Sequence, residues 1–244
     1  MALFETMRVH KKKIIRLDEH LERLERGAKK LSLKIPCTKN QLKQIIQKKA
    51  QAVPYQDVYL KVILWRTPLR TILSFIVKKY QPHPVKIFRR GFSGRIGRWK
   101  IQQGHILSEV KSTQRLFYEV KFNAAKSRGF DEALIENSAG YLTEASRSNI
   151  FWVKDNTLFT PALACGCLPG ITRGLVLDLA RQKKIKAREG EFRAVDLYSA
   201  DEAFLTNSLM GIMPLTKVNR CKIGNGKPGK ITCQLIKKYN CLLK

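Results

Sequence analysis

Residues 141–151 are Tyr-Leu-Thr-Glu-Ala-Ser-Arg-Ser-Asn-Ile-Phe, and residues 168–173 are Leu-Pro-Gly-Ile-Thr-Arg. The first segment places one acidic residue, Glu144, between two short runs typical of β-strands. The second opens a predicted helix with Gly170, and the first turn of a helix presents backbone N–H groups and the positive end of the helix dipole. Together the two segments predict a carboxylate at a strand end and a place that suits a phosphate.

Two more features add to these segments. Lys111 stands at the entrance to a predicted helix that continues Ser-Thr-Gln-Arg-Leu, and Thr206-Asn207-Ser208 follows a predicted strand and offers hydroxyl and amide donors. Each feature alone has an ordinary explanation, since a single lysine is usually on the surface and a glutamate beside a strand is usually solvated. Their order and spacing along the chain favour a functional site.

The residues around these features predict a succession of short elements. The helix expected over 113–127 has Leu116, Val120 and Ala124 on one face and closes at Gly129. Turn-forming residues separate the next strands and favour an antiparallel meander. The predicted strands are 132–136, 141–143, 149–153 and 158–160, followed by a helix from 170 to about 181, a strand over 203–206 and a helix over 230–239.

The first third of the chain predicts a small α+β unit. Its first helix has one apolar stripe and is expected to end at Pro36. A polar helix over 39–50 and strands over 59–65 and 71–77, rich in β-branched and aromatic residues, follow. The stripe consists of Leu17, Leu21, Leu24, Ala28 and Leu31.

Residues 80–84, Tyr-Gln-Pro-His-Pro, favour an extended connection, because two prolines remove backbone donors. We therefore expect a domain boundary here. A small domain would cover residues 1–82, and a larger domain would cover residues 83–244 and carry both Lys111 and Glu144.

Positive charge dominates the composition. The 244 residues include 47 Lys+Arg against 19 Asp+Glu, a net charge of +28, and residues 58–108 contain no acid. The hydrophobic fraction of 44% excludes a wholly disordered basic tail. The charge suits nucleic acid, and it suits equally an enzyme that attracts anionic ligands. The aromatic pattern of an RNA-binding sheet and the heptads of a basic zipper are both missing, so the charge alone decides neither.

The six cysteines form no CxxC pair and lie near no histidine cluster, so no metal site is expected. We interpret them, Cys165 and Cys167 included, as reduced thiols of a cytoplasmic protein. No apolar run approaches the roughly 18 residues that cross a bilayer, and the first basic run follows the apolar start of the chain. Neither a membrane span nor export is expected.

With these motifs in place, the sequence resembles the class IV aminotransferase family, pyridoxal-phosphate enzymes of fold type IV. The family includes branched-chain and D-amino acid aminotransferases and aminodeoxychorismate lyase. The resemblance covers almost the whole chain. It rests on residues 4–8 (Phe-Glu-Thr-Met-Arg), 20–24 (His-Leu-Glu-Arg-Leu), Lys111, Glu144 in its Glu-Ala-Ser-Arg-Ser-Asn context, 168–173, 200–202 and 206–214.

The resemblance implies an α/β fold of the α+β type, with a small N-terminal domain and a larger mixed-sheet, pseudo-barrel domain with helices. It implies pyridoxal 5'-phosphate as the cofactor, held covalently by Lys111, which would also act as general base, with Glu144 facing the pyridine nitrogen. Lys121 and Lys126 are rivals for Lys111, but they lack its Lys-x-x-x-Arg-Leu context. The phosphate would be held by Arg23, the backbone of Ile171 and Thr172, and Ser208.

Within the family, the sequence looks most like aminodeoxychorismate lyase. The similarity lies in the separation of 33 residues between Lys111 and Glu144, and in residues 60–62, 129–134 and 206–214. Aminotransferases typically carry a Gly-Thr-Ala or Thr-Thr-Ser loop where this chain has Asn-Ser-Leu, and the Arg-x-His pair of D-amino acid aminotransferases has no clear match. The lyase eliminates pyruvate from 4-amino-4-deoxychorismate and gives 4-aminobenzoate for folate biosynthesis. The alternatives are a branched-chain or D-amino acid aminotransferase and, second, a basic nucleic-acid-binding protein that has lost catalysis.

The lyase substrate is a small anionic molecule with two carboxylates, so arginines are expected beside it. Family members are dimers, so a homodimer is expected, whereas a nucleic-acid or membrane partner is not. Family members also have a strand or two before the Phe-Glu-Thr motif, so the small domain is expected to be shortened. The candidate substrate-binding residues are Arg66, Arg70, Arg95, Arg98, Arg147 and Asn207.

Overall fold

The computed structural model describes residues 2–102 and 109–243, except for the side chains of residues 98 and 99. The chain divides into two compact units. The first comprises Met1–Pro82, Val110–Gln114 and Leu242–Lys244, and the second comprises His83–Glu109 and Arg115–Cys241. The side chain of Arg98, a candidate substrate-binding residue, lies outside the described part of the chain.

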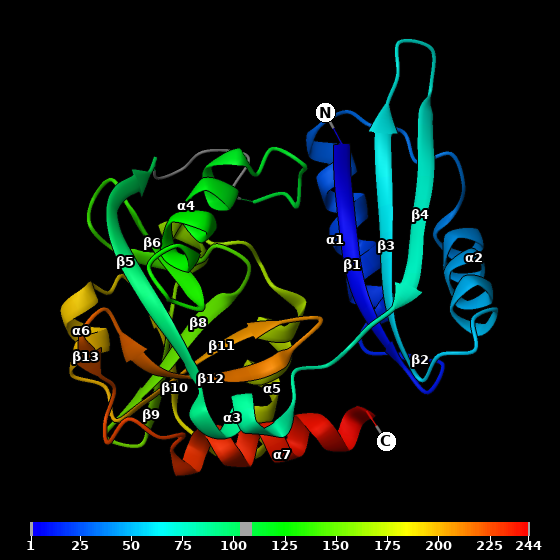
Figure 1. The fold of residues 1–244 in the computed structure, drawn as a ribbon. Coiled ribbons are helices and arrows are strands. Elements are labelled where there is room, and N and C mark those ends of the chain that lie inside the picture. Colours follow the sequence, from blue (N-terminus) through cyan, green and yellow to red (C-terminus); the bar gives the residue numbers. More distant parts are fainter. Residues whose placement is uncertain (1, 103–108, 244) are drawn as a thin grey trace. The chain divides into compact units, whose positions relative to one another are not determined.

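The first unit is built on a four-stranded antiparallel sheet with the order β2-β1-β3-β4, accompanied by two helices (Figure 1). The two predicted helices and the two predicted strands of this region are all present. The elements are β1 (Ala2–His10), β2 (Lys13–Ile14), α1 (Leu17–Lys30), α2 (Lys39–Gln51), β3 (Asp57–Arg66) and β4 (Thr71–Lys79).

Helix α1 buries the predicted apolar stripe from Leu17 to Ala28. It ends at Lys30, well before Pro36, because the chain turns back on the last carbonyls of the helix. The N–H of Leu33 donates to the carbonyl of Ala28 at 2.8 Å, and the intervening Ser32 has a left-handed backbone with φ of 51°. The expected end at Pro36 is therefore wrong.

Strand β1 has no counterpart among the predicted elements. Its charged residues Glu5 and Arg8 argue against a strand in a core. In the structure β1 pairs with β3 along its whole length, and both charges have partners, since Glu5 binds α1 and Arg8 binds Asp57 of β3. The strand is therefore stabilised by contacts between residues far apart in the sequence.

The segment Val110–Gln114 joins the first unit by pairing with the start of β1. The N–H of Phe4 donates to the carbonyl of Lys111 at 2.9 Å, and the N–H of Thr113 donates to the carbonyl of Ala2 at 2.8 Å. This placement corrects the expectation that the domain over 83–244 carries Lys111, because the backbone of that residue is hydrogen-bonded within the smaller unit.

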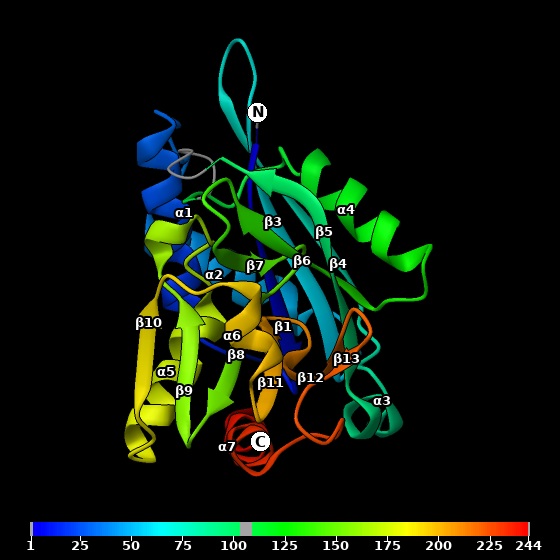
Figure 2. The same ribbon diagram turned by 90° about the vertical axis from the view of Figure 1, so that its left-hand side faces the viewer.

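The second unit is built on a mixed nine-stranded sheet with the order β10-β9-β8-β11-β12-β5-β6-β7, and β13 pairs with β12 off this path (Figure 2). Helix α5 packs against β10 and β11. The strands are β5 (Phe92–Ile101), β6 (Glu132–Asn137), β7 (Leu142–Ala145), β8 (Asn149–Lys154), β9 (Thr157–Pro161), β10 (Ala187–Gly190), β11 (Glu202–Asn207), β12 (Gly211–Val218) and β13 (Cys221–Lys222). The helices are α3 (Val85–Arg90), α4 (Leu116–Lys126), the 3₁₀ turn η2 (Leu163–Cys165), α5 (Ile171–Gln182), α6 (Ala194–Tyr198) and α7 (Lys230–Leu243).

The predicted strands between 132 and 160 are present, but they do not form one continuous meander. β6 pairs with β7 and β8 pairs with β9, while β8 has β11 as its other neighbour. The turn between β7 and β8 explains the break. The N–H of Ser146 donates to the carbonyl of Ala133, and the hydroxyls of Ser146 and Ser148 bind the carboxylate of Glu132. The meander is therefore wrong at this turn.

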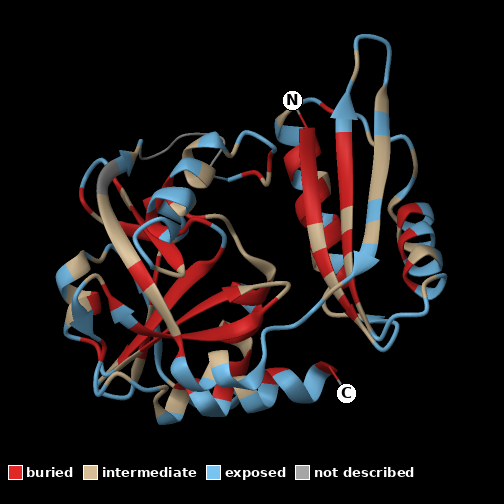
Figure 3. Cartoon of the chain, in the orientation of Figure 1, coloured by how far each residue is buried: buried red, intermediate tan, exposed pale blue. Residues whose placement is uncertain are grey.

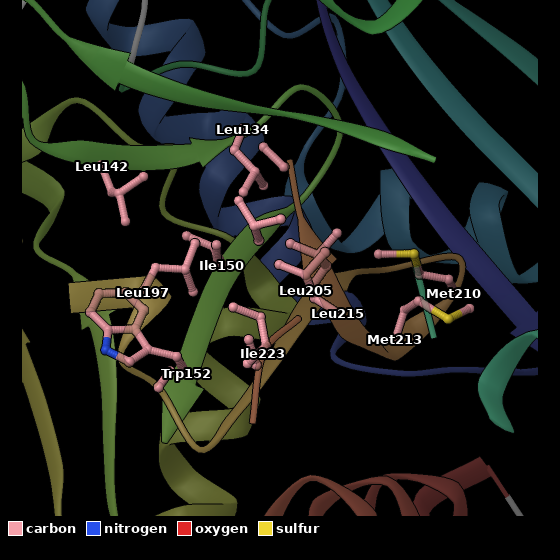
Figure 4. Close-up of a cluster of buried hydrophobic side chains, with 14 residues drawn as sticks. Leu134, Leu142, Ile150, Trp152, Leu197, Leu205, Met210, Met213, Leu215 and Ile223 are labelled. Carbon is pink, nitrogen blue, oxygen red and sulfur yellow. The ribbon is translucent and has the colours of Figure 1, made fainter. Parts of the chain in front are cut away.

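Alternation along β8 and β11 divides their side chains between two faces of the sheet. Ile150, Trp152 and Leu205 point to one face and join the apolar core cluster that Figure 4 shows. Phe151 and Phe204 point to the other face, where their rings stack at 5.1 Å between centroids. Both faces are therefore covered, as a sheet inside a domain requires.

Helix α4 turns a different face to the core than the sequence predicts. Leu116, Val120 and Ala124 are exposed, and Figure 3 shows α4 as mainly exposed and intermediate. Ala125 is buried instead, in a small cluster with residues of β6 that Phe117 and Tyr118 also contact. The face with Leu116, Val120 and Ala124 is therefore not the one that packs on β6, because aromatic side chains on the neighbouring face of the helix make that contact.

Candidate active site

A buried cluster of charges lies between β1 and α1 in the first unit. The Nε of Arg23 donates to Oε1 of Glu5 at 2.8 Å, and its Nη2 donates to Oε2 at 2.7 Å. His20, one turn earlier on α1, places Nδ1 2.6 Å from Oε2 of the same carboxylate. All three side chains are almost fully buried. The spacing of three residues puts His20 and Arg23 on one face of the helix, toward the strand that carries Glu5.

The two titratable groups of this cluster have displaced pKa values. Burial alone would raise the pKa of Glu5, but the charge and hydrogen bonds of Arg23, together with His20, lower it to about 2. Burial lowers the pKa of His20, although Glu5 opposes this effect, and the charge of Lys111 adds to the lowering. Glu5 is therefore a carboxylate, and His20 is a neutral imidazole that donates Nδ1–H to it.

Lys111 lies near this cluster and is half-buried. Its Nζ is 4.7 Å from the ring centroid of Phe4, and the Nζ of Lys61 is 4.2 Å from the same centroid. The face of an aromatic ring is a favourable contact for an ammonium group. The ring of Phe4 thus holds the amine of Lys111 beside β1, the strand that also carries Glu5.

In the second unit, Glu144 is buried on β7. Its Oε2 accepts a hydrogen bond from the backbone N–H of Leu168 at 3.0 Å and lies 3.5 Å from Nδ2 of Asn149. Burial raises the pKa of the Cys167 thiol to about 12, and the charge of Glu144 adds to this effect. Burial likewise raises the pKa of Tyr118, to which Glu144 contributes by its charge and a hydrogen bond. The carboxylate therefore has neutral neighbours and N–H donors around it.

The start of α5 is a helix N-terminus, a place that suits an anion. Its first turn, with Ile171 and the buried Thr172, follows Gly170, and no side chain of the described residues caps it. The hydroxyl of Thr206 is buried and has no hydrogen-bond partner among the described residues. Thr206 pairs with Asn149 across the β8–β11 ladder, so the two side chains share a face of the sheet, the one on which Asn149 lies close to Gly170. A helix dipole with an unpartnered hydroxyl suits the phosphate of pyridoxal phosphate.

Ser208 follows on the turn after β11, which Asn207 shapes. The Oδ1 of Asn207 accepts hydrogen bonds from the N–H groups of Leu209 and Met210 at 3.0 and 2.9 Å, and its Nδ2 donates to the carbonyl of Arg147 at 3.1 Å. The amide of Asn207 thus joins the turn that carries Ser208 to the turn that carries Arg147. These contacts are those of a residue that shapes loops.

The candidate arginines fall into different surroundings. Arg66 and Arg70 are exposed in and after β3, and Arg95 is half-buried on β5. Arg147 is exposed, and its Nη2 donates to Glu119 at 2.6 Å. The guanidinium of Arg147 also lies over the ring of Phe122, 3.6 Å from the centroid. The structure therefore brings Arg147 to α4.

The rival lysines on α4 differ from each other. Lys121 is buried, its Nζ lies 5.4 Å from the ring centroid of Phe117, and burial lowers its pKa. Lys126 is exposed at the end of the helix. Lys121 therefore remains a physical competitor of Lys111, since a buried lysine loses its proton more readily than a solvated one.

Sequence reasoning did not single out Glu5 and His20 in the first unit or Asn149 in the second. Glu5 and His20 stand in the motifs that carry the family resemblance, but their pairing depends on the position of β1 against α1. Asn149 is likewise the last residue of the Glu-Ala-Ser-Arg-Ser-Asn motif. An asparagine at a predicted strand start, five residues after the key carboxylate, is the signal that could have drawn attention to it.

Within residues 2–102 and 109–243 no group of three or more His, Cys, Asp or Glu side chains is arranged to bind a metal ion. Over the same residues no helix is long and apolar enough to span a membrane. Cys165 and Cys167 are free thiols that point to backbone carbonyl oxygens, Cys165 to Gly190 and Cys167 to Ala162.

Comparison with known proteins places the chain in a family. Residues 2–218 match the family described as Amino-transferase class IV. The D-alanine aminotransferase of Listeria monocytogenes is 28% identical over 249 residues, which cover 96% of this chain and 84% of the relative. The aminodeoxychorismate lyase of Bacillus subtilis is 26% identical over 254 residues, which cover 100% of this chain and 86% of the relative.

Among solved structures, the branched-chain amino acid aminotransferase from Escherichia coli superposes with a TM-score of 0.91. It is 22% identical, and the match covers 100% of this chain and 85% of that one. The two-unit fold is therefore that of fold type IV. The family match extends over most of the chain, so the protein is an enzyme that uses pyridoxal 5'-phosphate, and it belongs to the class IV aminotransferases.

Proposed function

We propose that the protein is a 4-amino-4-deoxychorismate lyase, which removes pyruvate from its substrate and releases 4-aminobenzoate. The observation that carries this choice is the loop at Asn207-Ser208-Leu209, where aminotransferases of the family carry Gly-Thr-Ala or Thr-Thr-Ser. Here the side chain of Asn207 makes three hydrogen bonds, none of which a glycine could make, and a threonine would have to make all three through a single hydroxyl. The lyase of Bacillus subtilis, which aligns over the whole chain, supports the same choice.

Each cofactor-binding residue has a role in this proposal. When bound, pyridoxal phosphate supplies an aldehyde that joins the substrate amine and a ring that accepts electrons from the adjacent carbon. Lys111 tethers the cofactor through Nζ, and the same amine then removes the proton from the substrate carbon that bears nitrogen. The carboxylate of Glu144, held by the N–H of Leu168, keeps a proton on the pyridine nitrogen.

The phosphate would bind the first-turn N–H groups of Ile171 and Thr172 and the hydroxyl of Ser208. Arg23 is the further candidate from the resemblance, but its Nε and Nη2 already bind Glu5. A contact of Arg23 with the phosphate would be made by this same guanidinium. Glu5 would act on it as the group that fixes the orientation of the guanidinium.

The elimination needs no further reactant, because its electrons, proton and leaving group are all accounted for. The pair of electrons from the broken C–H bond moves into the ring of the substrate and expels the enolpyruvyl oxygen, so that the C–O bond breaks. The leaving group takes up a proton and becomes pyruvate, and the remaining ring becomes aromatic. The two substrate carboxylates would meet arginines, and the candidates are Arg66, Arg70, Arg95 and Arg147, of which Arg147 also binds Glu119.

A paired assay tests the proposal. One sample of the cofactor-loaded protein receives 4-amino-4-deoxychorismate, and a second receives D-alanine or a branched-chain amino acid with 2-oxoglutarate. We expect 4-aminobenzoate and pyruvate in equal amounts from the first sample. Glutamate from the second sample without 4-aminobenzoate from the first would show that the protein is an aminotransferase and not the lyase.

An aminotransferase is the second candidate, because relatives of that activity match the chain about as well as the lyase does. The residues that hold the cofactor would be unchanged under this alternative. The difference would lie in how the half-reaction ends, since Lys111 would then return its proton to the cofactor carbon. The paired assay separates the two because only the aminotransferase produces an amino acid from 2-oxoglutarate.

A further inference from the structure

We infer that Asn149 is a positioning residue that holds the Glu144 carboxylate and the start of α5 in one fixed arrangement. The inference rests on the proposed roles of Glu144 and of the first turn of α5. It adds a residue that binds neither the cofactor nor the substrate, and it makes the side chain of that residue responsible for the spacing between the ring end and the phosphate end of the cofactor site.

The nitrogen side of the amide acts on Glu144 through Leu168. The Nδ2 of Asn149 donates to the carbonyl of Leu168 at 2.9 Å, and the N–H of Leu168 donates to Oε2 of Glu144 at 3.0 Å. The direct separation from Nδ2 to Oε2 is longer, 3.5 Å. Asn149 therefore orients the residue whose N–H holds the carboxylate, and it adds a weak donor of its own.

The oxygen side of the amide acts on α5 through Gly170. A Cβ atom added at Gly170 would lie 2.0 Å from Oδ1 of Asn149 and 3.1 Å from its Cγ. The backbone of Gly170 has a φ of −69°, which any residue adopts, so glycine is needed here for space alone. The amide and the residue that precedes α5 are thus in close contact, and the helix start cannot shift toward β8.

Burial makes this arrangement rigid. Asn149 is 5% exposed, and Thr206, its partner across the ladder, is 1% exposed. The hydrogen bond from Asn149 to the carbonyl of Leu168 is partly buried, so removal of the amide would leave this carbonyl without its donor, which costs free energy. The loop from Leu168 to Gly170 would then relax, and both ends of the cofactor site would move with it.

A double-mutant cycle on the cofactor-free protein tests the contact itself. Gly170→Ala should destabilise the protein because its methyl group displaces the amide, and Asn149→Ala should destabilise it because a buried hydrogen bond is lost. The double variant has room for the methyl group, so its loss of melting temperature should be clearly smaller than the sum of the two single losses. Additive losses would overturn the inference.

Cofactor binding provides the second readout. The dissociation constant of pyridoxal phosphate, followed by quenching of tryptophan fluorescence, should rise about tenfold in Asn149→Ala. Asn219→Ala is the matched control, because that amide also makes two hydrogen bonds in the second unit, to the N–H of Ile96 and to the hydroxyl of Tyr198. The control should bind the cofactor like the wild type, and equal weakening in both variants would overturn the positioning role.

Asn149→Asp keeps the shape of the side chain and replaces Nδ2 by an oxygen. The second carboxylate would lie next to Glu144 and oppose its ionisation. The visible absorbance of the bound cofactor changes with pH, and we expect the midpoint of this change to lie at a higher pH than in the wild type. An unchanged midpoint would contradict the inference. If the wild-type protein fails to bind the cofactor, the proposed function fails, whereas the double-mutant cycle still decides whether Asn149 holds the start of α5.

Discussion

The guanidinium of Arg23 donates two hydrogen bonds, of 2.8 and 2.7 Å, to the carboxylate of Glu5, and both side chains are almost fully buried. A buried ion pair of this kind fixes geometry more than it adds stability, because both charges have lost their water. Its value here is orientation, since it holds one edge of the arginine fork against β1. Loss of either partner removes both of these hydrogen bonds from a charge that stays buried.

Glu5→Gln should therefore destabilise the protein by about 3 kcal/mol, as expected when one partner of a buried pair is lost. Urea denaturation of wild type and variant measures the difference. Asp18→Asn is the matched control, because Asp18 pairs with Lys43 on the surface, where ion pairs contribute little. A similar loss of unfolding free energy in both variants would show that the buried pair matters no more for stability than a surface pair.

Stability should also depend on pH through the same cluster. The pKa of Glu5 is about 2 in the folded protein and 4.5 for the ordinary group, so the unfolded chain binds a proton first as the pH falls. The contribution of Glu5 to the free energy of unfolding is therefore complete above about 4.5 and disappears between 4.5 and 2. Glu5→Gln should flatten this part of the curve.

His20 should contribute at higher pH. Its pKa is lowered below 6.5 by burial, so the unfolded chain takes up the proton first and stability begins to fall as the pH drops below 6.5. His83, whose pKa burial also lowers, acts in the same direction. Denaturation of His20→Gln, His83→Gln and the double variant between about pH 5 and 8 separates the contributions of the two histidines. If the stability of His20→Gln depends on pH as that of the wild type does, the predicted contribution of His20 is wrong.

Glu144→Gln tests the carboxylate at the pyridine nitrogen. The amide keeps the shape of the side chain but cannot hold a charge, so the ring nitrogen should lose its proton and turnover should fall by roughly 100-fold. The cofactor should still bind, because the phosphate contacts remain. The absorbance spectrum reports the ring proton independently of turnover, and a variant with normal spectrum and normal rate would exclude this role for Glu144.

Ser208→Ala tests the phosphate end. Loss of a hydrogen bond to a charged group should raise the dissociation constant of pyridoxal phosphate about tenfold. Ser199→Ala removes a hydroxyl that donates to the carbonyl of Asp196 at the surface of α6, so it should leave cofactor binding unchanged. Equal affinity in the wild type and Ser208→Ala would remove Ser208 from the proposed site.

Part of the surplus charge has a structural use in the first unit. Lys78 lies over the ring of Tyr59 at 5.0 Å from the centroid, Lys49 over Phe75 at 4.9 Å, and Lys61 over Phe4 at 4.2 Å. These three lysines thus make cation–π contacts with aromatic rings of β4, β3 and β1. The family match shows that the protein is an enzyme, so the positive charge by itself is no argument for nucleic-acid binding.

The sequence predicted the helices and strands whose periodicity is local. The stripe of α1 and the β-branched run of β3 are complete in themselves, so no distant contact was needed to find them. β1 escaped because its charges are neutralised by α1 and β3, and the exposed face of α4 was misjudged because Phe117 and Tyr118 take the contact with β6.

In the candidate site, too, local motifs could be found from the sequence, whereas contacts between distant residues could not. Lys111, Glu144 and the start of α5 were found from their motifs, and their roles stay predictions. The pairing of Arg23 with Glu5 and the contact of Asn149 with Gly170 depend on how elements far apart in the chain are placed. No spacing along the sequence contains this information.

The most direct test of the account is to find the lysine that holds the cofactor. The loaded protein is reduced with borohydride, digested and analysed by mass spectrometry, with Lys111→Ala as the control. We predict that the mass of the reduced cofactor is found on the peptide that contains Lys111 and is lost in the control. Its appearance on Lys121 or Lys126, or its persistence in Lys111→Ala, would contradict the account.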